Sequence, residues 1–240
     1  AAARMVLANS AGIAERIDAR DVRVVHLGTD VPPAVERHDG PAAVVTVAHL
    51  IARKRHADVL RALPAGMRYD VVGDGPERKA LEELSAELGH GDRVTFHGQL
   101  EHERALEVGR RADVFAMPST DEAFGVAYVE AMAGWLPAIG AAGEPGPQEI
   151  VDAGDAVLPY AGGRGRGPGR GRGMTLVPPA DPPALAAAIH ALLTGGGVSL
   201  RAAGAHARAT VQRAFSWDAC GAATVAAYEA ALAAKGGRSA

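Results

Sequence analysis

The residues best suited to chemistry lie in one short stretch, EAFGVAYVE, which runs from Glu122 to Glu130. It follows an apolar run expected to be a strand, and Phe124 to Val126 is expected to open the next helix. A helix N-terminus offers free N–H groups and a positive dipole end, which together suit a diphosphate. Gly125 lets a phosphate approach the backbone closely. Glu122 precedes the helix and Glu130 falls in its second turn, so both carboxylates can face one ligand. The alternative is an ordinary helix with a solvated glutamate.

Two further turns carry candidate residues. The cationic segment HLIARKRH places His49, Arg53 and Lys54 between a predicted strand and a predicted helix, where they can neutralise phosphate oxygens. A solvated basic turn is the alternative. The tight turn Gly-Asp-Gly-Pro begins at Gly73, and its alternative is a plain strand-to-helix turn. The aspartates and histidines show no spacing typical of a metal site, so no metal is expected.

The elements that must position these residues alternate between apolar runs and helix-like stretches. Strands are predicted over 43–48, 69–72, 93–96, 113–117 and 136–139, with helices over 56–63 and 77–88 among them. This alternation predicts an α/β fold, a Rossmann-like parallel sheet with helices on both faces. Ligands of such sheets bind beyond the carboxyl ends of the strands. All the candidate residues fall there.

The two ends of the chain depart from this alternation. Residues 4–8 and 22–26 predict short strands, with a helix from the cap Asn9-Ser10 to about Ile17, and 28–33 is typical of a linker. Alanine-rich helices are predicted over 182–193, 199–214 and 218–234. The Gly/Arg-rich stretch 162–173 predicts a flexible surface loop. Nucleic-acid binding by its arginines is the less favoured alternative, because no aromatic side chain there could stack on bases.

Composition limits the classes of function. The chain has 240 residues, of which 48% are hydrophobic, enough for a large buried core. The net charge of −3 favours neither nucleic acid nor an anionic membrane. No apolar run approaches the ~20 residues of a transmembrane helix. The single cysteine, Cys220, excludes an intrachain disulfide and fits a reducing compartment, so a cytoplasmic protein is expected.

From Asn9 to about Glu229 the chain resembles the family-4 retaining glycosyltransferases, in which two Rossmann-like domains face each other in the GT-B fold. The most specific likeness is the pair Glu122 and Glu130, with seven residues between them. The resemblance implies a donor substrate that is a UDP-, GDP- or ADP-sugar. It further implies retention of the anomeric configuration, no metal ion and no other cofactor. The acceptor is not indicated.

The resemblance also implies roles for single residues. Glu122 would hydrogen-bond the donor sugar, and Glu130 would bind the ribose hydroxyls. Lys54 would bind the diphosphate. His49 stands where the family has an arginine and would replace it in part, with help from Arg53 or Arg55.

Backbone groups complete the implied site. Phe124, Gly125 and Val126 would offer N–H groups to sugar or phosphate. The backbone near Leu100 would meet the base, and the turn at Gly73 would approach the ligand. Residues 146–150 resemble the loop and helix that close the site.

The same likeness divides the chain. Residues 1–30 would be the remnant of an N-terminal acceptor domain and linker, most of which is missing. Residues 31–240 would form the donor nucleotide-sugar-binding domain, ending in a helix at about 216–235. Such a fragment would bind nucleotide but would be inactive alone. The alternatives are a nucleotide-binding module without activity and a GT-B-fold sugar-nucleotide epimerase. The two-glutamate motif favours the transferase.

Overall fold

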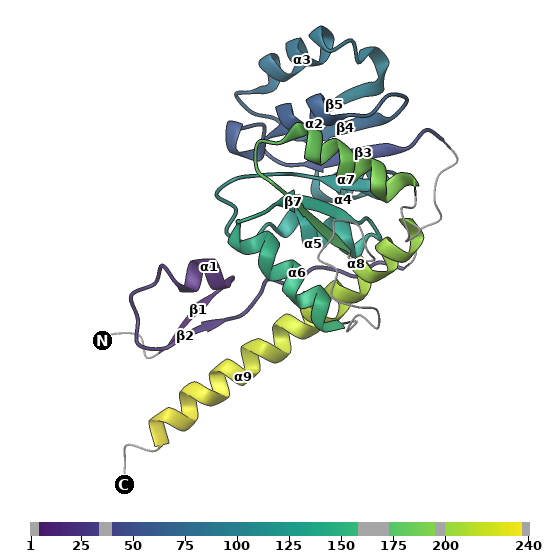
Figure 1. Cartoon of the computed structure of the whole chain (residues 1–240). Coiled ribbons are helices and arrows are strands. Elements are labelled where there is room, and N and C mark those ends of the chain that lie inside the picture. Colours follow the sequence, from purple (N-terminus) through teal and green to yellow (C-terminus); the bar gives the residue numbers. More distant parts are fainter. Residues whose placement is uncertain (1–4, 34–39, 158–172, 195–199, 237–240) are drawn as a thin grey trace.

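The main body is a single parallel sheet of six strands in the order β5-β4-β3-β6-β7-β8 (Figure 1). The computed structural model describes residues 5–33, 40–157, 173–194 and 200–236. The strands are β3 (Ala43–Val47), β4 (Arg68–Val72), β5 (Val94–Gly98), β6 (Val114–Ala116), β7 (Ala138–Ala141) and β8 (Met174–Val177). The parallel Rossmann-like sheet predicted from the sequence is confirmed.

The central strands are buried on both faces, as their continuous apolar sequence predicts. Successive side chains of a strand point to opposite faces. Accordingly, Val44 packs into one hydrophobic cluster and Val45 into another, and both are fully buried. Val114 and Phe115 divide between the same two clusters. The sheet therefore separates two cores.

Helices cover both faces of the sheet. Side chains of α2 (His56–Ala62), α3 (Arg78–Glu87) and α7 (Pro182–Thr194) fill the first cluster. Side chains of α4 (His102–Arg110), α5 (Val126–Ala133) and α6 (Pro145–Val157) fill the second. Helix α8 (Leu200–Ala214) contributes to both clusters. This two-sided cover is the predicted one.

The strand order reverses at the centre of the sheet. From β3 the chain proceeds outward through β4 and β5, then returns to β6 on the other side of β3 and proceeds through β7 and β8. The loops after β3 and β6 therefore diverge to opposite sides. In open α/β sheets such a switch point leaves a crevice at the carboxyl ends of the strands.

One strand begins later than predicted, and another strand was not predicted. Strand β7 begins at Ala138 rather than Leu136, because Pro137 has no N–H for the ladder and the N–H of Leu136 instead bonds to Ala131 at the end of α5. Strand β8, which pairs with β7, was not predicted. The predicted loop 162–173 lies outside the described residues except for Gly173.

A small separate unit precedes the main body. Strands β1 (Val6–Ala8) and β2 (Val22–Val24) form a two-stranded parallel sheet beside α1 (Ala11–Ala14). Ser10 caps α1 by accepting from the N–H of Ile13 at 3.2 Å. The helix ends at Ala14, before the predicted Ile17, because the N–H of Arg16 bonds only three residues back.

Backbone hydrogen bonds are among the contacts that attach the small unit to the main body. The N–H of Ala11 donates to both carboxylate oxygens of Glu149 on α6, at 3.1 Å each. The N–H of Thr29 donates to the carbonyl of Phe215 at 2.9 Å, just before α9 (Trp217–Gly236). Figure 1 shows α9 projecting from the main body past this unit. Its bounds agree closely with the predicted terminal helix.

A buried polar relay ties α2 to the sheet beside the switch point. His56, which is 2% exposed, places Nδ1 3.3 Å from the Tyr69 hydroxyl. That hydroxyl lies 2.8 Å from Oγ1 of Thr46, which donates to the carbonyl of Ala116. Burial lowers the pKa of His56 to about 4; the carbonyl of His49 opposes this shift and the charge of Lys54 adds to it.

The buried histidine predicts acid sensitivity. An unfolded histidine has a pKa near 6.5, so between about pH 6.5 and 4 the unfolded chain binds the extra proton. Stability is complete above this window and falls as the pH falls through it. We expect His56 to lower the unfolding free energy by about 2 kcal/mol from pH 7 to pH 5, measured by urea denaturation. His56→Gln should flatten this dependence, whereas His190→Gln, at an exposed position of α7, should not. An unchanged slope in His56→Gln would contradict the assignment.

Candidate functional site

Two loops that leave the sheet at the switch point bring the strongest sequence candidates together. Lys54 ends a 3-10 turn, Ala52–Lys54, after β3, and Glu122 lies in the loop between β6 and α5. Lys54 Nζ lies 2.5 Å from Glu122 Oε2, and both side chains are largely buried. The structure therefore joins residues 68 positions apart in sequence.

The backbone between these loops is also cross-linked. The N–H of Thr120 donates to the carbonyl of Arg53 at 2.8 Å. In return, Arg53 Nη1 donates to the carbonyl of Asp121 at 3.2 Å. Arg55, with a φ of 60°, turns the chain in the left-handed region, and α2 starts directly after it at His56. The cationic segment thus forms an ordered turn beyond the carboxyl end of β3, and Arg53 is exposed there.

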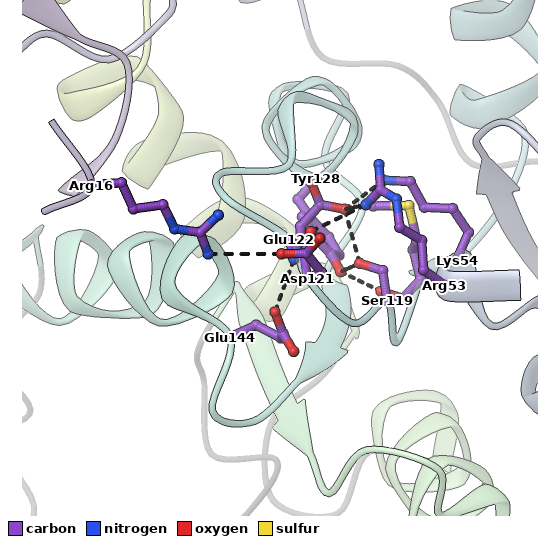
Figure 2. Close-up of polar contacts among 9 residues, drawn as sticks. Arg16, Arg53, Lys54, Ser119, Asp121, Glu122, Tyr128 and Glu144 are labelled. Atoms are coloured by element: carbon purple, nitrogen blue, oxygen red, sulfur yellow. Dashed lines mark hydrogen bonds and ion pairs between the residues drawn. The ribbon is translucent and has the colours of Figure 1, made fainter. Parts of the chain in front are cut away.

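The carboxylate of Glu122 receives three cationic or polar groups at one oxygen (Figure 2). Besides Lys54, Ser119 Oγ donates to Oε2 at 2.9 Å, and Arg53 Nη1 lies 3.9 Å from it. The Glu122 side chain is 10% exposed. A buried carboxylate requires such partners, because desolvation of an unpaired charge is costly.

The backbone of Glu122 is held from the other side by the start of α6. Its N–H donates to Glu144 Oε2 at 2.8 Å, and its carbonyl accepts from the N–H of Gly146 at 3.2 Å. A Cβ at Gly146 would lie 2.4 Å from Cα of Phe124, so glycine permits this close approach. Gly146, in the predicted closing segment 146–150, thus contacts the two-glutamate motif. The contact of Glu144 with Glu122 was not predicted from the sequence, and only the position of Glu144 after a strand could have suggested it.

Helix α5 begins at Val126, with Gly125 as its N-cap in the left-handed region at φ 88°. A Cβ at Gly125 would lie 2.4 Å from the Tyr128 ring, which explains the glycine. The side chain of Phe124 is buried, stacked on His26 at 5.4 Å and edge-on to Phe215 at 5.5 Å. Only the backbone of Phe124 is thus available to a ligand.

Glu130 lies in the second turn of α5, as expected, in different surroundings from Glu122. Its side chain is 20% exposed, and Oε1 lies 3.7 Å from His102 Nε2 at the start of α4. Burial raises the pKa of Glu130, and His102 opposes this shift. The two residues line a cavity of about 40 Å³ whose other walls are mostly apolar, including Val47 and Phe115. Sequence reasoning missed His102.

The remaining candidates lie in the segments that follow β3, β4 and β5. Gly73, at φ 131°, follows β4, and a Cβ there would lie 2.0 Å from the Ala48 carbonyl. A Cβ at Gly75 would lie 2.5 Å from the ring of His49, which is exposed. Leu100, beyond β5, is half-buried against the second core cluster. Both glycines are thus required by close packing of the turn after β4 against the segment after β3.

The described residues include no candidate metal site: no three His, Cys, Asp or Glu side chains among them are grouped as they would be to hold a metal ion. None of the helices there has the length and apolar character needed to cross a membrane.

Comparison with known proteins identifies the family. The model described as glycosyl transferases group 1 matches residues 30–209. The chain belongs to this family. The resemblance predicted from the two-glutamate motif is therefore confirmed.

Relatives in this family are similar over parts of their length. The lipopolysaccharide core biosynthesis glycosyltransferase LpsE of Rhizobium meliloti is 32% identical over 173 residues, which are 63% of this chain and 50% of that protein. The D-inositol 3-phosphate glycosyltransferase of Xylanimonas cellulosilytica is 34% identical over 173 residues, 70% of this chain and 37% of that protein. The chain thus spans half or less of these relatives.

Solved glycosyltransferase structures share the fold. Sucrose-phosphate synthase from Thermosynechococcus elongatus superposes with a TM-score of 0.76 and 28% identity, covering 96% of this chain and 59% of that one. Anabaena HepE in complex with UDP-glucose gives a TM-score of 0.74 at 21% identity, covering 96% and 64%. The described fold is that of a group 1 glycosyltransferase.

The Lys54–Glu122 pair yields a stability prediction. Lys54→Met removes the cation and leaves the Glu122 carboxylate buried beside Ser119, so we expect the unfolding free energy at pH 7 to fall by about 1–3 kcal/mol. Urea denaturation at pH 7 measures this loss. Arg53→Met is the control and should have a smaller effect, because the Arg53 cation is exposed and lies 3.9 Å from the same carboxylate. Equal losses in the two variants would contradict the buried ion pair.

Proposed function

We propose that this chain is the donor-binding half of a glycosyltransferase that takes a sugar from a nucleoside-diphosphate sugar. The observation that carries the proposal is the meeting of Lys54 and Glu122 at the switch point, beside the N-terminus of α5. This arrangement combines a cation, a carboxylate and free helix N–H groups in one crevice. A sugar diphosphate presents the complementary groups: anionic phosphates and hydroxyl donors.

In the proposed complex the diphosphate lies at the N-terminus of α5 and near Lys54. When the bond between sugar and diphosphate breaks, negative charge grows on the leaving diphosphate. Lys54, Arg53 and the helix N-terminus stabilise that charge electrostatically. Glu122 accepts hydrogen bonds from the sugar. No metal ion is required in this scheme, because the protein itself supplies the positive charge.

The nucleoside would extend from the diphosphate toward α4. Glu130 would accept from the ribose hydroxyls, and the backbone near Leu100 would meet the base. Support for a nucleotide comes from HepE, whose complex holds UDP-glucose, and from a mannosyltransferase of Mycolicibacterium smegmatis described as GDP-mannose-dependent. These names include two bases, so UDP- and GDP-sugars are both candidates here. Retention of configuration is proposed from the family-4 likeness.

The acceptor side is proposed to belong to a second Rossmann-like domain, with residues 1–30 as its last part. The β1–β2 sheet has two strands, fewer than an independently stable sheet needs. The chain also covers only 59% and 64% of two solved neighbours. On this proposal the 240-residue chain binds the donor without turnover. Membership of a glycosyltransferase family gives no support to the epimerase alternative.

The first test is a binding panel. Isothermal titration of the chain with UDP, GDP and ADP should give heat with at least one of them, because the proposed donor residues all lie in the main body. Affinity should be weak, in the millimolar to high micromolar range, since the facing domain would complete the site. Adenosine, uridine and guanosine serve as controls for the diphosphate contribution. No heat with any nucleoside diphosphate at millimolar concentration would contradict the proposal.

Glu130→Gln tests the ribose contact. A carboxylate can accept from two hydroxyls, whereas an amide has one oxygen and presents an NH₂ group. Affinity for the preferred nucleoside diphosphate should fall about tenfold, as expected for loss of a charged hydrogen-bond pair. The melting temperature should change little, because the ion pair at Glu130 is a 3.7 Å contact to an exposed histidine.

The matched control is Glu87→Gln, which changes an exposed glutamate on α3 far from the crevice. Its affinity and melting temperature should equal those of the parent. Parental affinity in a well-folded Glu130→Gln variant would remove Glu130 from the nucleotide site.

A further inference from the structure

Ser119 lies beneath Glu122 and is completely buried. Its hydroxyl donates to Glu122 Oε2 at 2.9 Å and also lies 3.2 Å from the hydroxyl of Tyr128 (Figure 2). The Tyr128 hydroxyl itself donates to the carbonyl of Met117. Burial raises the pKa of Tyr128, so this donor keeps its proton. Because the tyrosine proton is engaged at Met117, the serine proton goes to the stronger acceptor, the carboxylate.

These contacts leave the two oxygens of Glu122 in different situations. In the part of the chain that the structure describes, the side-chain hydrogen bonds and ion pairs of Glu122 all reach Oε2. A ligand hydroxyl can therefore be accepted by Oε1. Which way Oε1 points depends on what holds Oε2.

The two close partners of Oε2 differ in how a ligand affects them. Lys54 is a flexible cation at the crevice, and a bound diphosphate would compete with Glu122 for it. Ser119 is fully buried, and its hydroxyl cannot be reached by a ligand. The serine bond therefore persists when Lys54 turns to phosphate.

We propose that Ser119 is a positioning residue, which fixes Oε2 of Glu122 so that Oε1 faces the donor sugar. The inference rests on the proposed function and adds a residue that acts through Glu122 rather than by touching the donor. It predicts that removal of the serine hydroxyl affects recognition of the sugar and leaves the nucleoside diphosphate largely unaffected. If the Ser119 hydroxyl had only a structural role in the core, its removal would affect nucleotide and sugar ester equally.

The test compares each nucleotide with its sugar ester. The 240-residue chain and Ser119→Ala are titrated with UDP and UDP-glucose, and with GDP and GDP-mannose. For the pair that the parent binds, the affinity ratio of sugar ester to nucleotide should fall about fivefold in Ser119→Ala, as expected for loss of one hydrogen bond to a charged group. Affinity for the nucleotide alone should change less than twofold.

A double-mutant cycle tests whether the serine acts through Glu122. Glu122→Ala alone should lower the same ratio. Ser119→Ala added to Glu122→Ala should lower it no further, because the serine hydroxyl then has no side-chain acceptor to orient. Additive effects of the two substitutions would overturn the inference.

Two further variants control for folding. Ser85→Ala removes another buried serine hydroxyl, on α3, and should leave every affinity unchanged. Ser119→Cys keeps the side-chain shape with a weaker donor and should lower the ratio as well, which provides a second variant where Ser119→Ala does not fold. An unchanged ratio, or equal losses for nucleotide and sugar ester, would overturn the inference. No binding of any nucleotide by the parent would instead contradict the proposed function itself.

Discussion

The ion pair between Lys54 and Glu122 is the contact on which the arrangement of the site depends. The loops after β3 and β6 diverge from the centre of the sheet, and nothing in either sequence compels them to meet. A carboxylate that is 10% exposed is stable only when paired, so its burial binds the second loop to the first. The bond from Thr120 to the carbonyl of Arg53 then fixes the register between them.

The pair also balances the positive charge of the proposed diphosphate site. Cations gathered without a counter-ion would repel one another and destabilise the fold. Glu122 supplies the negative charge at Lys54, and in the proposed complex a diphosphate would supply it instead. Binding on this scheme exchanges one anion for another at Lys54. The carboxylate is then free of its cation but still held by Ser119 and, through its backbone, by Glu144.

The sequence predicts elements better than it predicts the contacts among them. The run at β3 is predicted well because β-branched residues buried on both faces leave a continuous apolar signal. Strand β8 was missed because its four residues follow the Gly/Arg-rich stretch and have no alternation of their own. Lys54 and Glu122 could be named as candidate ligand residues from their types and positions. The contact between Lys54 and Glu122 could not be predicted, because it joins residues 68 positions apart and no local pattern encodes it. The hydrogen bond from Ser119 to Glu122 spans only three positions, but it depends on how the loop folds.

The loop that carries Glu122 and Phe124 is also contacted by residues from the N-terminal part of the chain. Glu149 accepts from the N–H of Ala11 and lies 2.7 Å from Nε2 of His26, whose ring stacks on Phe124. Phe124 is 3% exposed and packs between His26 and Phe215, so a displacement of Phe124 would disturb the segment after β2 that carries His26. Closely packed interiors transmit such displacements rather than absorb them. The backbone that would meet a sugar diphosphate is therefore packed, through Phe124 and His26, against the segment that follows β2.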